Sequence, residues 1–415
     1  MIFSGPLVLS LVIIISSGYL VRFLGKKIHL PSALPLMGLG LLIGSEGLDI
    51  ISNDYIKISP YFSKIAFVIL LVRAGIGLSP EILKKFLSTT FFLGIIPLLV
   101  EGFTLVFLGK NLIFENWLMA MLFSTIIMCE SPAIIFPMML KMRKKRLGTG
   151  KMIPNKMMVK TLGNIIIVQV LIFFTIDFVL FNEGNKVSFL PYYLFPLNIL
   201  FGAFVGIFFG KIISWKKITD LENQNSTYGA TIFLIIVSSI LFFGLGYFKV
   251  ENILCVIFFA IFSCKHLKKK KSLIDNHLFE IWSLFEIFLF FNLGTQIKIS
   301  VFKDFPTFVN VLIIIIGAHF FRQLILGITL LKSKYSKREA LYIGFAHFPK
   351  ATIQAVYGGL PLIIFSQMNL FHLFKEAEII LMAAVCSIIL TAPLGAFLID
   401  KMASKLLQKE FEKIN

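Results

Sequence analysis

The sequence predicts an all-α integral membrane protein of about thirteen transmembrane helices, built as inverted repeats with two broken crossing helices. Hydrophobic residues make up 57% of the 415 residues, and the mean hydropathy is +0.89. Apolar runs near the roughly 20 residues that a helix needs to cross a bilayer recur along the chain. Two of these runs contain prolines beside charged residues. No soluble segment is left over, so we expect residues 1–415 to form a single transmembrane domain.

The predicted helices follow the apolar runs in order. They cover residues 3–21, 30–51, 62–80, 87–108, 112–140, 157–181, 190–213, 228–248, 250–264, 278–297, 307–331, 340–365 and 377–400. The first run begins at the N-terminus and leads directly into Arg22, Lys26 and Lys27. This pattern fits a first membrane span better than a cleavable signal peptide.

The basic residues predict the orientation of these helices. A net charge of +18 could indicate a nucleic-acid partner, but most of the 40 basic residues lie in the loops that follow odd-numbered runs. The positive-inside rule then places the N-terminus outside and the C-terminus inside a bacterial-type inner (plasma) membrane. The run Lys268–Lys271 becomes a cytoplasmic loop beside anionic lipid. We therefore expect membrane lipid as a partner and no nucleic acid.

The fifth and twelfth runs are interrupted in similar ways. The fifth contains Pro132 and Pro137, and the twelfth contains Pro349 followed by Gly358-Gly359. Proline removes a helical hydrogen bond, and freed carbonyls are tolerated at membrane depth where the backbone is buried or lines a cavity. The two runs lie seven positions apart, so they cross in opposite directions, as in inverted repeats. Paired interrupted helices indicate a transporter substrate site, whereas two ordinary proline kinks are the simpler alternative.

Ionisable residues within the runs are candidates for function, because unpaired charges are not tolerated in hydrocarbon. The main ones are Arg73, Lys160, Arg322, Lys350, Glu101, Glu130 and Glu286. The four cysteines are scattered, and neither His319 nor His347 has a second His or Cys nearby. We therefore predict no metal site and no cofactor. No nucleophile–base pair or phosphate loop is visible either, so an enzyme is not expected.

Several motifs resemble those of the bacterial and organellar sodium/proton antiporters in the monovalent cation:proton antiporter superfamily. They occur in the family's order, and they are Leu71-Val72-Arg73-Ala74-Gly75-Ile76-Gly77-Leu78, Ser131-Pro132-Ala133-Ile134-Ile135-Phe136-Pro137, Gly148-Thr149-Gly150-Lys151-Met152-Ile153-Pro154 and Pro349-Lys350-Ala351-Thr352-Ile353-Gln354-Ala355. The resemblance implies a homodimer of panel helices beside a mobile core with elevator-like alternating access. It also implies that Arg73, Glu101 and Arg322 form a structural charge network, and that Lys350 supports the ion site.

The ion site departs from this family. Its members have Asp-Asp or Asn-Asp on the sixth span, but the matching positions here are Asn164-Ile165 or Gly163-Asn164, depending on the alignment. Exchange by competition needs a group that binds the cation when charged and the proton when neutral. An asparagine amide does not titrate. The family's usual mechanism therefore cannot be transferred to this position.

Two interpretations remain open. In the first, the carboxylate has moved to Glu130, directly before the Ser131-Pro132 break, or to Glu286. In the second, Lys160, one helical turn before Asn164, pairs with Glu130 as an internal cation in place of bound sodium. Either carboxylate could also simply neutralise a nearby cation.

We expect a secondary active transporter that exchanges a monovalent cation (Na⁺, K⁺ or Li⁺) for protons by alternating access. The candidate ion-binding and proton-coupling residues are Glu130, Ser131, Asn164, Glu286, Lys350, Lys160 and Thr125, with Pro132 and Pro349 marking the helix breaks. The alternative is a non-exchanging or degenerate family member (channel-like or regulatory), or a carrier of a small anion attracted by Lys160 and Lys350.

Overall fold

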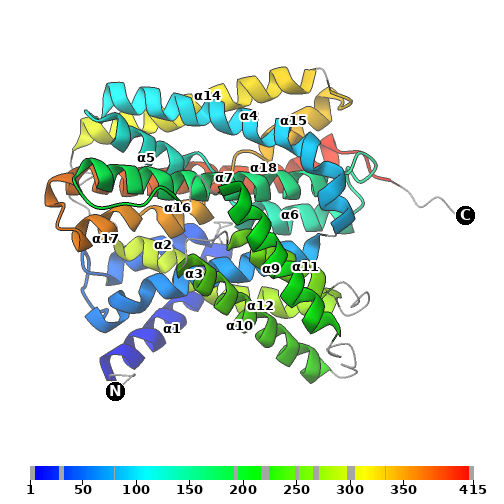
Figure 1. Cartoon of the computed structure of the whole chain (residues 1–415), viewed down its shortest axis with the longest axis horizontal. Helices are drawn as coiled ribbons and strands as arrows, with labels where there is room; N and C mark the ends of the chain where they lie inside the picture. Colours follow the sequence, from blue (N-terminus) through cyan, green and yellow to red (C-terminus); the bar gives the residue numbers. More distant parts are fainter. Residues whose placement is uncertain are drawn as a thin grey trace, which may run out of the picture. The chain divides into compact units, whose positions relative to one another are not determined.

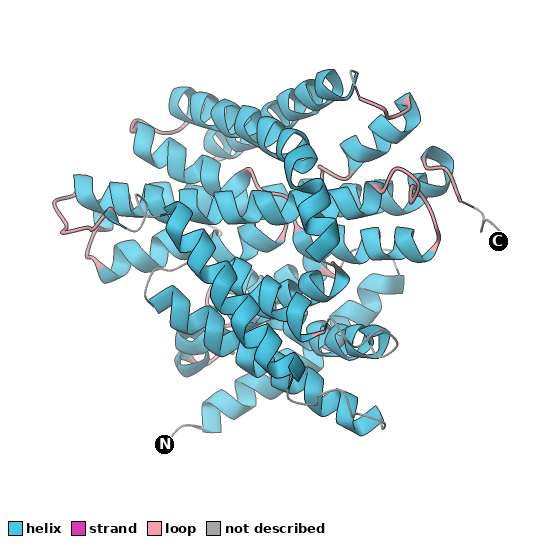
Figure 2. Cartoon of the chain, turned by 45° about the vertical axis from the view of Figure 1, so that its right-hand side comes forward, coloured by secondary structure: helices cyan, strands magenta, loops and turns pink. Residues whose placement is uncertain are grey.

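The described part of the chain is helical. The computed structural model describes residues 5–27, 32–78, 80–190, 195–215, 224–247, 252–264, 271–296, 304–331 and 333–410. Within these ranges the chain forms helices joined by loops, and the one β-type pairing is the isolated bridge between Leu147 and Lys409 (Figure 2). The basic run Lys268–Lys271 lies outside the described residues except for Lys271. The predicted all-α membrane fold is confirmed.

Each predicted apolar run overlaps a described helix or an interrupted pair of helices. The helices are α1 (Gly5–Lys27), α2 (Ala33–Ile43), α3 (Asn53–Gly77), α4 (Pro80–Leu112), α5 (Trp117–Ile127), α6 (Pro132–Lys144), α7 (Ile153–Asn182), α9 (Phe195–Trp215), α10 (Gln224–Tyr247), α11 (Ile253–Ser263), α12 (Lys271–Gln296), α14 (Phe305–Leu331), α15 (Lys337–Phe345), α16 (Thr352–Tyr357), α17 (Leu360–Gln367) and α18 (Phe374–Leu406). Ten segments among the described residues are long and apolar enough to cross a membrane. The count of thirteen crossings stays a prediction.

The contacts of the chain gather in two compact units. The first comprises Met1–Pro60, Phe86–Asn185 and Leu289–Asn415, and the second comprises Tyr61–Lys85 and Lys186–Phe288. In the second unit, α11 packs against α9 and α10. In the first, α7 packs against α5 and α6, while α18 packs against α5, α6, α14, α15 and α16 (Figure 1). Helix α7 is therefore held beside both halves of the first broken span.

The two helix breaks lie in the first unit and contact each other. Helix α5 ends at Ile127, α6 begins at Pro132, and the intervening Ser131 is extended. Its backbone N–H donates to the carbonyl of Pro349 at 2.7 Å, and its hydroxyl lies 2.9 Å from the hydroxyl of Thr352. Gln354 donates to the carbonyl oxygens of Ile126, Ile127 and Cys129 at 3.0–3.2 Å. Each break thus supplies partners for the backbone groups that the other leaves free.

Ion pairs and hydrogen bonds join three loops at one end of the first unit. Lys141 binds Asp400, and Lys151 binds Glu339, each at 2.6 Å. The hydroxyl of Thr149 lies 3.1 Å from Glu410. These contacts bring together the loops after the fifth, eleventh and thirteenth predicted helices. In the predicted topology an even number of crossings separates these loops, which agrees with their contact.

We predict that Gly395 on α18 is required for the close approach of α18 to the second break. A methyl group on Gly395 would lie 2.8 Å from Pro349 Cδ and 2.9 Å from Pro349 N. Proline cannot rotate away, so Gly395→Ala should destabilise the fold by about 1–3 kcal/mol. The measurement is the apparent Tm in detergent. The matched control is Gly327→Ala on α14, where an added methyl meets no atom within 4 Å. Equal Tm values for the two variants would contradict this packing.

Candidate ion-binding site

Glu130 is the centre of a buried charged cluster in the first unit. It lies in the break between α5 and α6 and is fully buried. Its Oε1 accepts from Lys160 Nζ and Arg322 Nη2, and its Oε2 accepts from Asn164 Nδ2 at 2.9 Å. The helix break explains why the carboxylate can reach both α7 and α14, because residues 128–131 leave the helical path and are not confined to one face of α5.

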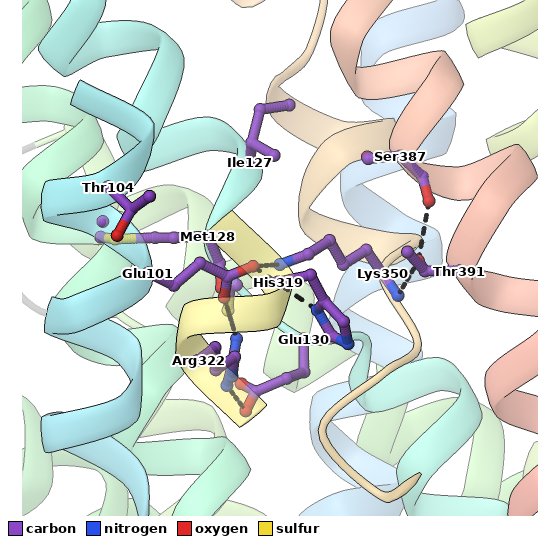
Figure 3. A network of polar contacts seen from close by, with 12 residues as sticks. Glu101, Thr104, Ile127, Met128, Glu130, His319, Arg322, Lys350, Ser387 and Thr391 are labelled. Carbon is purple, nitrogen blue, oxygen red and sulfur yellow. Dashed lines mark hydrogen bonds and ion pairs between the residues drawn. The ribbon is translucent and has the colours of Figure 1, made fainter. Parts of the chain in front are cut away.

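Arg322 connects Glu130 to a second buried carboxylate, Glu101. Arg322 Nη1 donates to Glu101 Oε2 and also to the carbonyl of Met128 at 2.9 Å. The other oxygen of Glu101 lies 2.8 Å from Lys350 Nζ and 3.7 Å from His319 Nδ1. Figure 3 shows Arg322 between the two carboxylates, with Lys350 reaching Glu101 from the opposite side. A planar guanidinium can satisfy both carboxylates in this way because its donors point in several directions.

Lys160 and Asn164 approach Glu130 from the same face of α7. They are four residues apart, so their side chains lie one turn from each other along the helix. Gly94 on α4 makes room for both, since a methyl there would lie 2.7 Å from Lys160 Cγ and 2.8 Å from Asn164 Oδ1. The structure therefore brings Lys160 and Glu130 together in the ion pair that the internal-cation interpretation requires.

The cluster has more positive than negative groups. Lys160, Arg322 and Lys350 face Glu101 and Glu130 among the residues described, and all five are at most 2% exposed. With every group in its ordinary ionic state, the cluster has one surplus positive charge. Such a surplus is unfavourable where the dielectric constant is low.

Two predicted residues belong to the second unit. Arg73 belongs to the second unit, where its Nε is 3.3 Å from Asp275 Oδ1 on α12. Helix α12 thus offers Arg73 a carboxylate within its own unit. Glu286 also lies on α12 in the second unit, outside the contacts described for the Glu130 cluster.

Thr125 is also directed away from Glu130. Its hydroxyl donates to the carbonyl of Leu122 at 3.0 Å and lies 3.4 Å from the hydroxyl of Thr175 on α7. Thr175 follows Asn164 by eleven residues, about 16 Å along the helix. Ser131 lies next to Glu130 in the chain, but its described bonds join the two breaks. No role was predicted for Gln354 or His347, and both are fully buried at the second break.

The comparisons with known proteins agree with this architecture. The profile of the family described as "Sodium/hydrogen exchanger, transmembrane" matches residues 9–398. A solved structure of the sodium proton antiporter MjNhaP1 from Methanocaldococcus jannaschii covers 97% of this chain and 98% of its own, with a TM-score of 0.74 and 20% identity. This likeness shows that the fold is that of a membrane antiporter. The chain belongs to the transmembrane sodium/hydrogen exchanger family.

Curated relatives support the same assignment. Sodium/hydrogen exchanger 9B2 of Mus musculus is 27% identical over 390 residues, which cover 92% of this chain and 70% of that protein. Sodium/hydrogen exchanger 9B1 of Homo sapiens is 24% identical over 391 residues, which cover 92% and 74%. The similarity thus extends over nearly the whole chain and includes both helix breaks.

We predict that Arg322 contributes strongly to stability. Arg322→Met would leave Glu101 and Glu130 without the charge that links them, and removing one partner of a buried pair costs about 3–5 kcal/mol. The matched control is Lys141→Met, which breaks a half-exposed pair with Asp400 worth at most about 1 kcal/mol. The measurement is the apparent Tm in detergent. If Arg322→Met and Lys141→Met lowered the Tm equally, the bridging role of Arg322 would be wrong.

Proposed function

We propose that this chain is a secondary active transporter that exchanges a monovalent cation for protons across the membrane by alternating access. Glu130 is the cation-binding carboxylate, and Asn164 is a supporting ligand. Lys160 is an internal cation that occupies Glu130 when no transported ion is bound. The observation that supports this most directly is the placement of Lys160 Nζ and Asn164 Nδ2 on the two oxygens of Glu130, a fully buried carboxylate at a helix break.

The arrangement of the units supports the transport mechanism. Glu101, Glu130, Lys160, Arg322 and Lys350 all belong to the first unit. A movement of that unit would therefore carry the complete cluster with it, as elevator-like alternating access requires. Helix α7 contributes Lys160 and Asn164, while the bonds between the two breaks, such as Ser131 N–H to Pro349 O, hold Glu130 in place.

The membrane placement is part of the same proposal. The loops rich in Lys and Arg face the cytoplasm, which puts the N-terminus outside and the C-terminus inside a bacterial-type plasma membrane. The contacts that gather three of these loops at one end of the first unit support this orientation. The homodimer and the lipid contacts that the family resemblance implies belong to the proposal as expectations.

A second candidate is a non-exchanging member of the family, or a carrier of a small anion. The observation in its favour is the surplus of buried cations, with Lys160 already bound to Glu130. Flux measurements separate the two candidates. Proteoliposomes under an imposed pH gradient should dissipate it when Na⁺, K⁺ or Li⁺ is added if the chain is a cation exchanger, and only with a permeant anion if it is an anion carrier.

We predict that Glu130→Gln abolishes cation-dependent dissipation of the pH gradient. The amide keeps the shape of the side chain but cannot attract a cation by charge or exchange a proton. The measurement is the quenching of a pH-sensitive dye in proteoliposomes. The matched control is Glu280→Gln, because Glu280 has a mostly exposed side chain on α12 and should keep normal exchange. Normal exchange by Glu130→Gln would show that this carboxylate is not the site.

We also predict that Lys160→Ala strengthens cation binding. Removing the ammonium frees Glu130 for Na⁺ or Li⁺, and a ligand that binds the folded state raises the Tm in proportion to the logarithm of its concentration over Kd. The Tm rise from added Na⁺ should therefore be larger in Lys160→Ala than in the native chain. Lys151→Ala, which removes a half-exposed loop lysine, is the matched control. An unchanged response to Na⁺ would argue against Lys160 as a competing cation.

A further inference from the structure

His347 lies at the second break with both ring nitrogens directed at backbone carbonyl oxygens. It follows the end of α15 and is fully buried. Its Nδ1 is 2.8 Å from the carbonyl oxygen of Ile343, and its Nε2 is 3.2 Å from the carbonyl oxygen of Leu93 on α4. A ring nitrogen can bond to a carbonyl oxygen only when it carries a hydrogen, because the carbonyl has no hydrogen to donate.

The first carbonyl is free because of a proline. In a regular helix the carbonyl of Leu93 would accept from the backbone N–H of residue 97, but that residue is Pro97, which has none. At membrane depth such a carbonyl needs another donor. His347 Nε2 is in position to provide it. The next residue, Gly94, makes room for Lys160 and Asn164, so this part of α4 contacts both the imidazole and the candidate ion site.

The second carbonyl is available because α15 ends there. The N–H that would continue the helix to Ile343 belongs to His347 itself, and it donates instead to Gly344 at 3.0 Å. The imidazole therefore lies between two acceptors that two separate helix irregularities have left without their usual donors. Neutral imidazole has one N–H and can satisfy one of them, while its other nitrogen presents a lone pair to the second carbonyl. Imidazolium has two N–H groups and satisfies both.

We propose that His347 is a proton-binding residue of the exchange cycle. This inference rests on the function proposed above. The proton binds at the imidazole when the cation site is empty and leaves when a cation binds near Glu130. The protonated ring is held by the carbonyl oxygens of Leu93 and Ile343, and the released proton passes to water on the open side of the membrane.

Electrostatics provides the coupling between the two sites. The charged groups that act on His347 are Lys160 on α7, Arg322 on α14 and Glu130 in the first break. Burial has the largest effect and opposes a positive imidazole; the two cations oppose it as well, and the carboxylate favours it. A proton on His347 and a cation at Glu130 each add one positive charge to a cluster that already has a surplus. Simultaneous occupation is disfavoured because like charges repel strongly where water is excluded. This mutual exclusion is the condition for exchange.

Solid-state NMR of chain labelled with ¹⁵N-histidine, in lipid bilayers, tests proton binding directly. The His347 signal is the one that is missing from the spectrum of His347→Gln. If His347→Gln does not fold, Gln variants of the other five histidines assign the remaining signals, and the His347 signal follows by elimination. We expect the neutral imidazole signal to convert to imidazolium on acidification, before the lowest pH at which the chain stays folded. Added Na⁺ or Li⁺ should move the midpoint to lower pH. The inference is overturned if the imidazole stays neutral over the whole pH range. It is also overturned if neither Na⁺ nor Li⁺ changes the pH midpoint of the titration.

Flux measurements are a second test of the role of His347. In proteoliposomes, His347→Gln should reduce cation-driven proton movement at least tenfold while keeping its Tm, because glutamine can still donate to the Leu93 carbonyl. The control is His277→Gln, which replaces another buried histidine, on α12 in the second unit. Native-like exchange and pH dependence in His347→Gln overturn the inference and leave the proposed function standing. If the native chain shows no exchange, the proposed function fails, and the NMR titration alone decides whether His347 binds the proton.

Discussion

The first unit depends on one guanidinium that binds two buried carboxylates. Arg322 donates to both Glu101 and Glu130, and each carboxylate has a lysine as its further partner. Isolated charges cost several kcal/mol each when they leave water, so none of these groups could be buried without the others. The charged side chains come from α4, the first break, α7, α14 and the second break. The ion pairs among them therefore fix how those segments pack. The site and the core of this unit are thus the same structure.

The backbone groups at the two helix breaks, like the charged side chains, can be buried only because they have partners. An interruption at membrane depth exposes N–H and C=O groups that water cannot reach. The amide nitrogen of Gln354 lies within hydrogen-bond distance of three carbonyl oxygens at the end of α5, and Ser131 N–H donates to the Pro349 carbonyl across the gap between the breaks. Thr391 on α18 accepts from the N–H of Lys350. A helix break is stable here because a second break, with suitable side chains, lies directly beside it.

The features of the fold that depend on composition and on the order of residues could be predicted from the sequence. Long apolar runs predicted the helices, and Pro132 and Pro349 predicted the two breaks, because proline acts locally. The sequence did not predict the pairing of Arg73 with Asp275, which lies about two hundred residues away and is one of several carboxylates that could have paired with it. Ser131 and Asn164 were recognisable from motif position. The pairing of Lys160 with Glu130 could be stated only as one of two possibilities, since spacing along α7 does not show what faces it.

In the proposed function, the ammonium group of Lys160 limits how tightly Glu130 can bind the transported ion. A cation that approaches Glu130 must displace a positive group that is tethered to α7 and therefore always present at high effective concentration. The displaced ammonium has no free carboxylate among the described groups of the cluster, because Glu101 is already shared by Arg322 and Lys350. Binding is therefore weaker than Glu130 alone would give. For a transporter this is favourable, because an ion bound against an internal competitor is also released readily on the opposite side, where Lys160 returns to Glu130.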